Sequence, residues 1–545
     1  MRRISFLLAT GLMTLMIPSC INDVLDKAPL DRFSDDAVWK DKDLINAFIS
    51  NTYRLMPIGF SGSAHQRLAG VTDESYQRGD GSNFINLGNI TPSSLGVLDS
   101  WTGASGFNYW LVITNCNIFF DRVDQAGFDE SLKERMTGEM KFLRAHAYFK
   151  LVAFFGGVPL IKNSFTLNDD FNVPRNTYDE CMDFVIKELD EAAALLPLTY
   201  NATNLGRITR GAALALKSRA LLYMASPLNN PANAVKKWED AAAAAKAVID
   251  LKQYTLFPNY KELFLKKNSY NPEVIWSRGF DVSVDPLDVR TELSQYPNGY
   301  GGFGQTHPLQ NIVDDYEMAS GKLPREDPSY NPQNPYINRD PRFYACILYD
   351  GAPFQGRPVE TFLPGGKDSN EGALSGWNAT LTGYYLRKFI DETVVNPSLQ
   401  NQGNSPWIFI RYAEVLLNYA EAMYHLGNEE VCREYLNMVR KRESVRMPDI
   451  TESGATLLKR LQNERRIELA FEEHRWFDVR RWKIAPERLN EYGRKMTIIR
   501  AADGSKTYTV SDFNPRAFYE RNYLVPIPQA EINKNPLLKQ NPGYN

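Results

Sequence analysis

Charged and large apolar side chains are closely interleaved in the stretch NERRIELAFEEHRWFDVRRW, residues 463–482. On a helix with about 100° per residue, Glu464, Glu468 and Glu472 fall on one strip, which Arg475 joins. Like charges four residues apart repel each other by roughly a few tenths of a kcal/mol per pair. Because apolar residues occur nearly all round the axis, the stretch predicts a central buried helix whose glutamates are compensated by arginines of packed neighbours.

Three glutamates on one strip are also compatible with a metal or acid–base site. A di-iron helical bundle carries Glu-x-x-His motifs on facing helices, whereas the residue three positions before His474 is Phe471. The five histidines are scattered, without an HExxH motif or a paired metal-ligand spacing. We therefore expect an ion-paired structural helix, with no metal, no cofactor and no catalytic residue.

The first twenty residues contain a basic pair, a short apolar run and a Ser-Cys step, in that order. The run is too short for a membrane-spanning helix, and the order is typical of a cleaved secretory leader, here residues 1–19. Acylation of Cys20 would anchor the mature chain, with residues 20–40 as a tether. The alternative is an ordinary signal peptide followed by a chance cysteine. No later segment is apolar enough to span a bilayer, so we expect membrane contact through the lipid anchor only.

Composition narrows the class of partner. The net charge is −3, and it becomes −5 when the two arginines of the leader are removed. Because no basic stripe is present, nucleic acid is not an expected partner. The cysteines beyond the leader are widely spaced and form no CxxC pair, so we expect buried thiols, with a disulfide as the alternative. These cysteines are Cys116, Cys181, Cys346 and Cys432.

Pairs of amphipathic helices recur along the chain and resemble tetratricopeptide repeats, which stack into a curved solenoid. Small residues in these segments allow helices to approach closely. The predicted fold is therefore mainly α: a scaffold of helical pairs at about 138–253 and 407–443. The predicted pairs are 138–155 with 178–196, 209–224 with 238–251, and 407–426 with 429–442, and further helices are predicted at 41–55 and 110–123.

Two long stretches, 72–108 and 281–404, lack such periodicity and are rich in glycine and polar or aromatic residues. Loops of that length are uncommon in compact domains unless they are functional. Residues 495–510 predict a hairpin around an Asp-Gly turn. The prolines near the C-terminus predict an extended strap that packs back on the body. We expect one body over residues 41–545.

Four motifs in order give the chain a resemblance to the SusD/RagB family. They are LRAHAYFKLVAFFGGVPLI (143–161), RDPRF (339–343), IRYAEVLLNYAEA (410–422) and the stretch 463–482 with the tail VPIPQAEINKNPLLKQNPGYN, within a C-terminal signature at 457–545. Members of that family are surface lipoproteins that capture nutrients for a TonB-dependent transporter. The resemblance implies a SusD-like fold, a lipid anchor at Cys20, a location on the outer face of the outer membrane and a SusC-like transporter as partner.

Binding residues are expected on the two long loops. Rigid aromatic rings accept the C–H faces of sugars, and neighbouring Asp, Asn or Arg side chains bind hydroxyl groups. In glycan-binding members of the family, an early Trp-bearing loop faces a later aromatic loop, and the two stretches of this chain resemble that arrangement. For each aromatic residue, packing inside the protein is the alternative role. The candidate residues are Asp73, Arg78, Trp101, Tyr296, Tyr300, Phe303 and Trp377.

These observations predict a non-enzymatic, lipid-anchored surface protein that captures oligosaccharides and delivers them to the transporter. A relative that captures peptides through the same loops is the first alternative. A surface glycoside hydrolase and a repeat scaffold without a small ligand are the others. Carboxylates are too numerous for their spacing alone to identify a glycosidase site.

Overall fold

The computed structural model describes residues 35–60, 68–78, 83–103, 108–284, 290–372 and 376–544. The predicted signal peptide, Cys20 and most of the predicted tether lie outside these ranges. The chain is mainly α-helical, as the sequence predicts. Within the described ranges, no helix combines the length and the apolar character needed to cross a bilayer.

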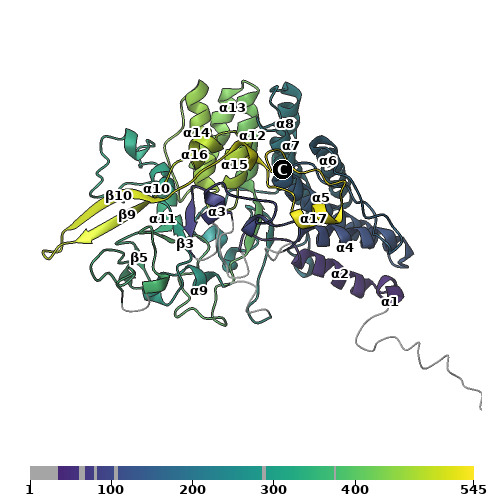
Figure 1. Ribbon diagram of the computed structural model, residues 1–545, viewed down its shortest axis with the longest axis horizontal. Helices are drawn as coiled ribbons and strands as arrows, with labels where there is room; N and C mark the ends of the chain where they lie inside the picture. The colour runs from purple at the N-terminus through teal and green to yellow at the C-terminus, as the bar shows by residue number, and fades with distance from the viewer. Residues whose placement is uncertain are drawn as a thin grey trace, which may run out of the picture.

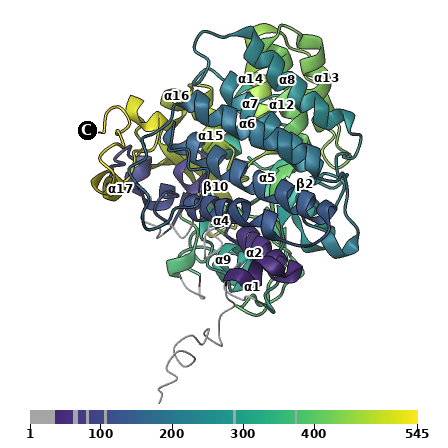
Figure 2. The ribbon, with the colours of Figure 1, turned by 90° about the vertical axis from the view of Figure 1, so that its right-hand side faces the viewer.

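One side of the molecule is an array of helices in which chain neighbours pack against each other (Figures 1 and 2). The order is α4, α5, α6, α7 and α8, and α12 then packs on both α8 and α13. Short α2 lies against α4 and α5 at the start of the array. The bounds are α2 Lys42–Arg54, α4 Tyr109–Arg122, α5 Glu130–Phe155, α6 Tyr178–Leu195, α7 Arg210–Ala225, α8 Val235–Asp250, α12 Tyr412–His425, α13 Glu429–Arg440 and α14 Gly454–Glu468.

Local sequence signals fix the ends and the spacing of these helices. Thr177 and Glu180 form a reciprocal capping box at the start of α6, which satisfies backbone N–H groups that the helix itself cannot pair. Asn108 and Thr209 cap α4 and α7 through their side-chain oxygens. Gly138 lets α5 approach the end of α6, because a Cβ atom there would lie 2.9 Å from Leu196.

The segment WIFIR, predicted as the first turns of a helix at 407–426, is instead strand β8 (Trp407–Arg411). It pairs antiparallel with β2 (Val274–Arg278), and all five of its side chains are buried. Aromatic and β-branched side chains suit a strand that is covered on both faces. The helical prediction was therefore wrong for these residues, and α12 begins only at Tyr412.

The predicted central helix is interrupted. Helix α14 ends at Glu468, and α15 (Arg475–Arg481) follows after a turn. Phe471 and Glu473 adopt φ values of 63° and 64°, a left-handed conformation that a right-handed helix excludes. Distant partners hold the turn: the Phe471 N–H donates to Glu74 Oε1 at 3.1 Å.

The compensation of the glutamate row by arginines is confirmed. Arg342 donates to both Glu464 and Glu468, and Arg411 donates to both Glu468 and Glu472. We call a set of ten buried residues, five cations and five carboxylates, the ionic lattice. Its members are Glu273, Asp340, Arg342, Lys388, Arg411, Arg440, Arg442, Glu464, Glu468 and Glu472. Buried Glu317 pairs with Arg440 at the edge of the lattice. Arg475, expected on the same strip, pairs with Asp73 instead.

The other side of the molecule is loop-rich and is built around small antiparallel pairs of strands (Figure 1). The pairs are β1 (Ser75–Gln77) with β3 (Thr306–Pro308), β4 (Ile347–Leu348) with β7 (Tyr385–Leu386), β5 (Pro353–Phe354) with β6 (Arg357–Pro358), and β9 (Gly493–Arg500) with β10 (Lys506–Asn514). The last pair is the predicted hairpin, and it extends beyond the predicted range 495–510. Short helices on this side are α3 Asn83–Asn86, α9 Thr291–Gln295, α10 Gln310–Asp315 and α11 Pro341–Cys346. Helix α1 (Asp35–Lys40) instead packs on α2, and α16 (Ala485–Leu489) packs on α15.

The C-terminal tail packs back on the helical array, as predicted. The Val525 N–H donates to Phe154 O at 2.8 Å, and Asn541 Nδ2 donates to Phe155 O at 2.9 Å. The tail is not extended throughout, because α17 (Gln529–Lys534) forms between two prolines that flank it rather than interrupt it. The four expected thiols are free and buried.

Burial of Glu74 makes the stability of the fold depend on pH. Burial raises the pKa of Glu74 from 4.5 to about 7, so the unfolded chain loses this proton at lower pH than the folded protein. The free energy of unfolding therefore falls as the pH rises from 4.5 to 7, by on the order of 3 kcal/mol from this group. Replacement of Glu74 by glutamine keeps the shape and removes the titration.

We expect Glu74→Gln to be more stable than the parent protein at pH 8 and to lose this advantage near pH 4.5. Urea denaturation of both proteins at the two pH values measures the difference. The same substitution at exposed Glu430 on α13 is the control. An equal effect of Glu74→Gln at both pH values would contradict the predicted titration.

Candidate ligand-binding site

The two long loops predicted to carry a ligand site meet in the structure. Strand β1 of the early loop pairs with β3 of the later loop. Arg78, directly after β1, donates its backbone N–H to Gln305 O at 3.3 Å. Its Nη1 also donates to Ala379 O at 2.8 Å. Ala379 is two positions after Trp377, so the second bond holds the Arg78 guanidinium against the segment that carries Trp377.

Trp377 and Phe303 form an aromatic pair at the surface. Their ring centroids are 5.8 Å apart with an interplanar angle of 42°. Trp377 is 63% exposed, although large apolar rings are usually covered. Asn378 Nδ2 donates to Gly302 O at 2.7 Å, which ties together the two segments that carry the rings. We call Phe303 and Trp377 the aromatic platform.

Tyr300 lies on the same segment as Phe303, but its ring is already occupied. The Arg357 guanidinium lies over the ring, 3.8 Å from its centroid, and pairs with Asp368 at 2.7 Å. The Tyr300 hydroxyl lies 3.0 Å from the carbonyl oxygens of Phe354 and Arg357, to which it donates. Burial raises the pKa of Tyr300, so the hydroxyl stays protonated. Tyr300 therefore supports the loop beside the platform and offers little open ring surface.

Three of the candidate residues lie in the interior, where they have structural roles. Asp73 is 3% exposed and forms ion pairs with Arg466 and Arg475. Trp101 is 5% exposed, and its ring packs edge-on against Trp110 and Phe155 at 5.2 and 5.1 Å. Neither side chain presents a surface that a ligand could reach.

The third is Tyr296, which is fully buried. Its hydroxyl donates to the backbone oxygens of Asp391 and Val394 at 2.5 and 3.0 Å. The residue thus closes the loop at 391–394 from inside. Of the seven candidate residues, the structure brings Arg78, Phe303 and Trp377 together near the surface, with Tyr300 beside them.

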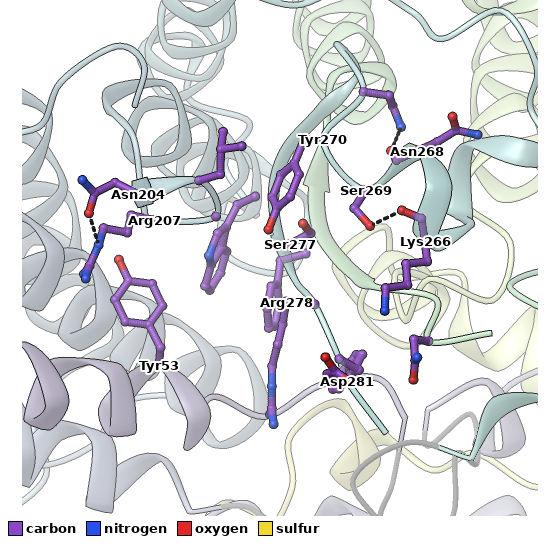
Figure 3. Close-up of a pocket in the computed structure, with 18 of the residues that line it drawn as sticks. Tyr53, Asn204, Arg207, Lys266, Asn268, Ser269, Tyr270, Ser277, Arg278 and Asp281 are labelled. Carbon is purple, nitrogen blue, oxygen red and sulfur yellow. Dashed lines mark hydrogen bonds between the residues drawn. The ribbon is translucent and has the colours of Figure 1, made fainter. Parts of the chain in front are cut away.

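A large cleft of about 1120 Å³ lies elsewhere, between the end of α2, the loop before α7 and the end of β2 (Figure 3). Tyr53 and Arg207 lie on one wall, Lys266 and Ser269 on the other, and Arg278 between them. No motif in the sequence indicates this cleft. Its described residues come from seven separate segments, between residues 50 and 409, with no shared motif, so only the fold reveals that they are neighbours.

The described part of the chain contains no cluster of three or more His, Cys, Asp or Glu side chains that could hold a metal ion. Burial lowers the pKa of His307 to about 3, and burial also holds the pKa of His146 and His474 well below the usual range. These three imidazoles are therefore neutral in the folded protein. His146 packs among rings, at 5.1 Å from Trp276.

Comparison with known families covers most of the chain. The model of the SusD family matches residues 272–544, half of the chain. The chain belongs to the SusD family. A second model, described as starch-binding and associating with the outer membrane, matches residues 96–222. Together the SusD-family matches contain β8, the ionic lattice, the tail, helices α4 to α6 and most of α7.

Other members of the SusD family match over nearly their whole length. A SusD-like protein of Bacteroides ovatus is 23% identical over 99% of this chain and 98% of its own. The crystal structure of a SusD-like protein from Bacteroides fragilis is 31% identical, with a TM-score of 0.81 over 95% of this chain and 100% of the other. A SusD-like carbohydrate binding protein from the same organism is 27% identical, with a TM-score of 0.79 over 92% and 100%.

Proposed function

We propose that this SusD-family protein binds oligosaccharides on the aromatic platform and passes them to a SusC-like TonB-dependent transporter. Family membership supports glycan binding, because a relative with the same fold is named as a carbohydrate binding protein. The second family model is named for starch binding in association with the outer membrane. The observation that carries the proposal is the exposed ring of Trp377 beside Phe303.

The platform suits a sugar for a physical reason. The C–H face of a sugar ring packs on a flat aromatic surface, and the rest of the ring presents hydroxyl groups. Stacking on one ring contributes about 1–3 kcal/mol in comparable base–aromatic contacts. One guanidinium N–H of Arg78 donates to Ala379 O. The other N–H groups of a guanidinium are donors of the kind that sugar hydroxyls accept. Affinity in the micromolar to millimolar range would follow, which suits a protein that must release its cargo.

The proposed location is the outer face of the outer membrane. Acylated Cys20 would hold the body there, and the helical array would dock on the transporter, because stacked helical pairs offer broad surfaces. The protein would break no bond in its cargo. Incubation with polysaccharide should therefore release no new reducing ends, and their appearance would favour the glycosidase alternative.

Trp377→Ala tests the platform. We expect its affinity for a bound neutral oligosaccharide to fall by about 5- to 150-fold, because one stacking surface of about 1–3 kcal/mol is removed. Isothermal titration calorimetry against a panel of neutral oligosaccharides measures the change. Tyr492→Ala is the matched control, since Tyr492 is also an exposed aromatic residue, with 50% of its surface accessible.

Unchanged affinity of Trp377→Ala for every bound oligosaccharide would remove the platform from the ligand site. Binding of peptides in place of oligosaccharides would favour the peptide-capturing alternative. A folded protein that binds neither oligosaccharides nor peptides would favour the alternative of a repeat scaffold without a small ligand.

A further inference from the structure

The cleft of Figure 3 is larger than most small-molecule sites. Its volume of about 1120 Å³ exceeds the range of about 300–1,000 Å³ that is usual for drug-sized ligands. Tyr270, on its rim, is 57% exposed. A ligand of several linked units fits this size better than a single small molecule does.

The described lining is positively charged. Arg54, Arg207, Lys266, Lys267 and Arg278 line the cleft, and the only carboxylate among the described lining residues is Asp281. This excess is local, because the whole chain carries a net charge of −3. Clefts lined by one sign of charge concentrate ligands of the opposite sign.

Two of these cations already hold ion pairs with carboxylates just outside the lining. Arg207 pairs with Glu139 at 2.9 Å, and Lys267 pairs with Glu262 at 2.9 Å. Among the residues that the structure describes, the cations outnumber the acids by five to three even with these two carboxylates included. Arg54 and Lys266, both exposed, have no ion-pair partner within 4 Å in the part of the chain that the structure describes.

Arg278 fixes the geometry between the walls. Its Nη1 donates to Arg54 O at 3.0 Å, at the end of α2, and its guanidinium lies 5.1 Å from the centroid of the Phe280 ring. The end of β2 is thereby tied to the end of α2. The cationic wall is built into the fold and does not depend on flexible surface chains alone.

The rest of the lining suits a polyhydroxylated ligand. Asn204, Asn268, Ser269 and Ser277 supply amide and hydroxyl groups, which donate to and accept from sugar hydroxyls. The floor is aromatic: Trp276 is stacked on a neighbouring ring of β8 at 4.0 Å. An ordinary neutral glycan would use these groups but would leave the excess of cations unmatched.

We propose that this cleft binds an acidic oligosaccharide, with Arg54 and Lys266 pairing with carboxylate or sulfate groups on the sugar rings. The proposal rests on the proposed glycan-binding function and adds to it a second site and a charge class. The cleft and the aromatic platform share no lining residue. Charge-assisted hydrogen bonds are stronger than neutral ones, so the anionic group would set the selectivity.

The test uses isothermal titration calorimetry with the purified chain and four probes: tetragalacturonate, heparin and chondroitin sulfate tetrasaccharides, and neutral galactotetraose. The double variant Arg54→Gln/Lys266→Gln removes the two lining cations that have no ion-pair partner within 4 Å among the described residues. The lining carboxylate Asp281 interacts with Lys266 at longer range. Lys236→Gln/Lys246→Gln, on the exposed face of α8, is the matched control, because each lysine there pairs within its own helix. Each titration is repeated at low and high NaCl concentration.

We expect at least one acidic tetrasaccharide to bind more tightly than galactotetraose, with an affinity that falls at high salt. The double variant should weaken this binding at least tenfold, while the control variant stays within twofold of the parent protein. The proposal is overturned if no acidic probe binds, or if the double variant binds it as the parent does.

Trp377→Ala separates the two sites in the same experiment. It should leave acidic binding in the cleft unchanged. If Trp377→Ala loses acidic binding and the double variant keeps it, the acidic ligand binds on the platform and the cleft proposal is overturned. If the double variant weakens acidic binding and Trp377→Ala leaves the binding of neutral oligosaccharides unchanged, only the platform proposal is overturned.

Discussion

Replacement of Arg411 by methionine is expected to lower the free energy of unfolding by about 3–5 kcal/mol. Arg411 is 1% exposed and contacts three carboxylates of the ionic lattice, Glu273, Glu468 and Glu472, at 2.7–2.8 Å. Burial alone raises the pKa of Glu472, yet Arg411 and Lys388 hold it below the usual range. Without Arg411, charge remains in the interior with fewer partners, and water cannot replace them.

Urea denaturation followed by tryptophan fluorescence measures this loss. The control is Lys236→Met, which removes an exposed pair with Asp240 on α8 and should cost less than about 1 kcal/mol. Addition of Glu472→Gln to Arg411→Met should recover part of the loss, because it neutralises one of the carboxylates that lost a contact with Arg411. Of the two cations that pair with Glu472 in the described part of the chain, only Lys388 remains. A cost of Arg411→Met equal to that of the exposed pair would show that the lattice contributes little to stability.

The second large effect is expected for Asp73→Asn, with a loss of about 2–4 kcal/mol in the free energy of unfolding. Burial raises the pKa of Asp73, but Arg466 and Arg475 outweigh this and hold it far below the usual range. Asparagine keeps the shape but leaves the two guanidinium groups without this negative charge. Arg466 retains Asp315 at 2.9 Å, which limits the cost.

The folded fraction of Asp73→Asn should bind oligosaccharides as the parent protein does, because the side chain is 3% exposed. Denaturation and calorimetry on the same preparation distinguish the two roles of this residue. Stability equal to that of the parent with weakened ligand binding would return Asp73 to the ligand site, as the sequence analysis proposed.

Local signals in the sequence were enough to predict most of the helical array. The predicted helix at 178–196 agrees with α6 because a Thr-x-x-Glu capping box precedes a regular apolar face. WIFIR was misassigned because a short apolar run fits both a buried strand and a buried helix. Its partner, β2, lies more than 100 residues earlier and decides the outcome.

The ligand site was predictable only as a region. Arg78, Phe303 and Trp377 come together because β1 pairs with β3 and because Arg78 reaches Ala379. Trp101 is buried because it packs against Phe155 of α5. The composition of the early loop does not indicate this contact. The cleft could not be predicted either, because its charged residues are distant along the chain and become neighbours only in the fold.

The partners inside the charged core are far apart along the chain. Arg466 and Asp73 are separated by 393 positions, and Arg411 and Glu273 by 138. Contacts of such long sequence separation form late and slow a chain's search for its native state. A growing or truncated polypeptide that stops before Glu464 holds Arg342 with Asp340 but without Glu464 and Glu468, and it holds Asp73 without Arg466 and Arg475. We therefore expect folding to be cooperative from the first loop to the last helices, and a chain truncated before residue 464 to be more open to proteases than the full chain.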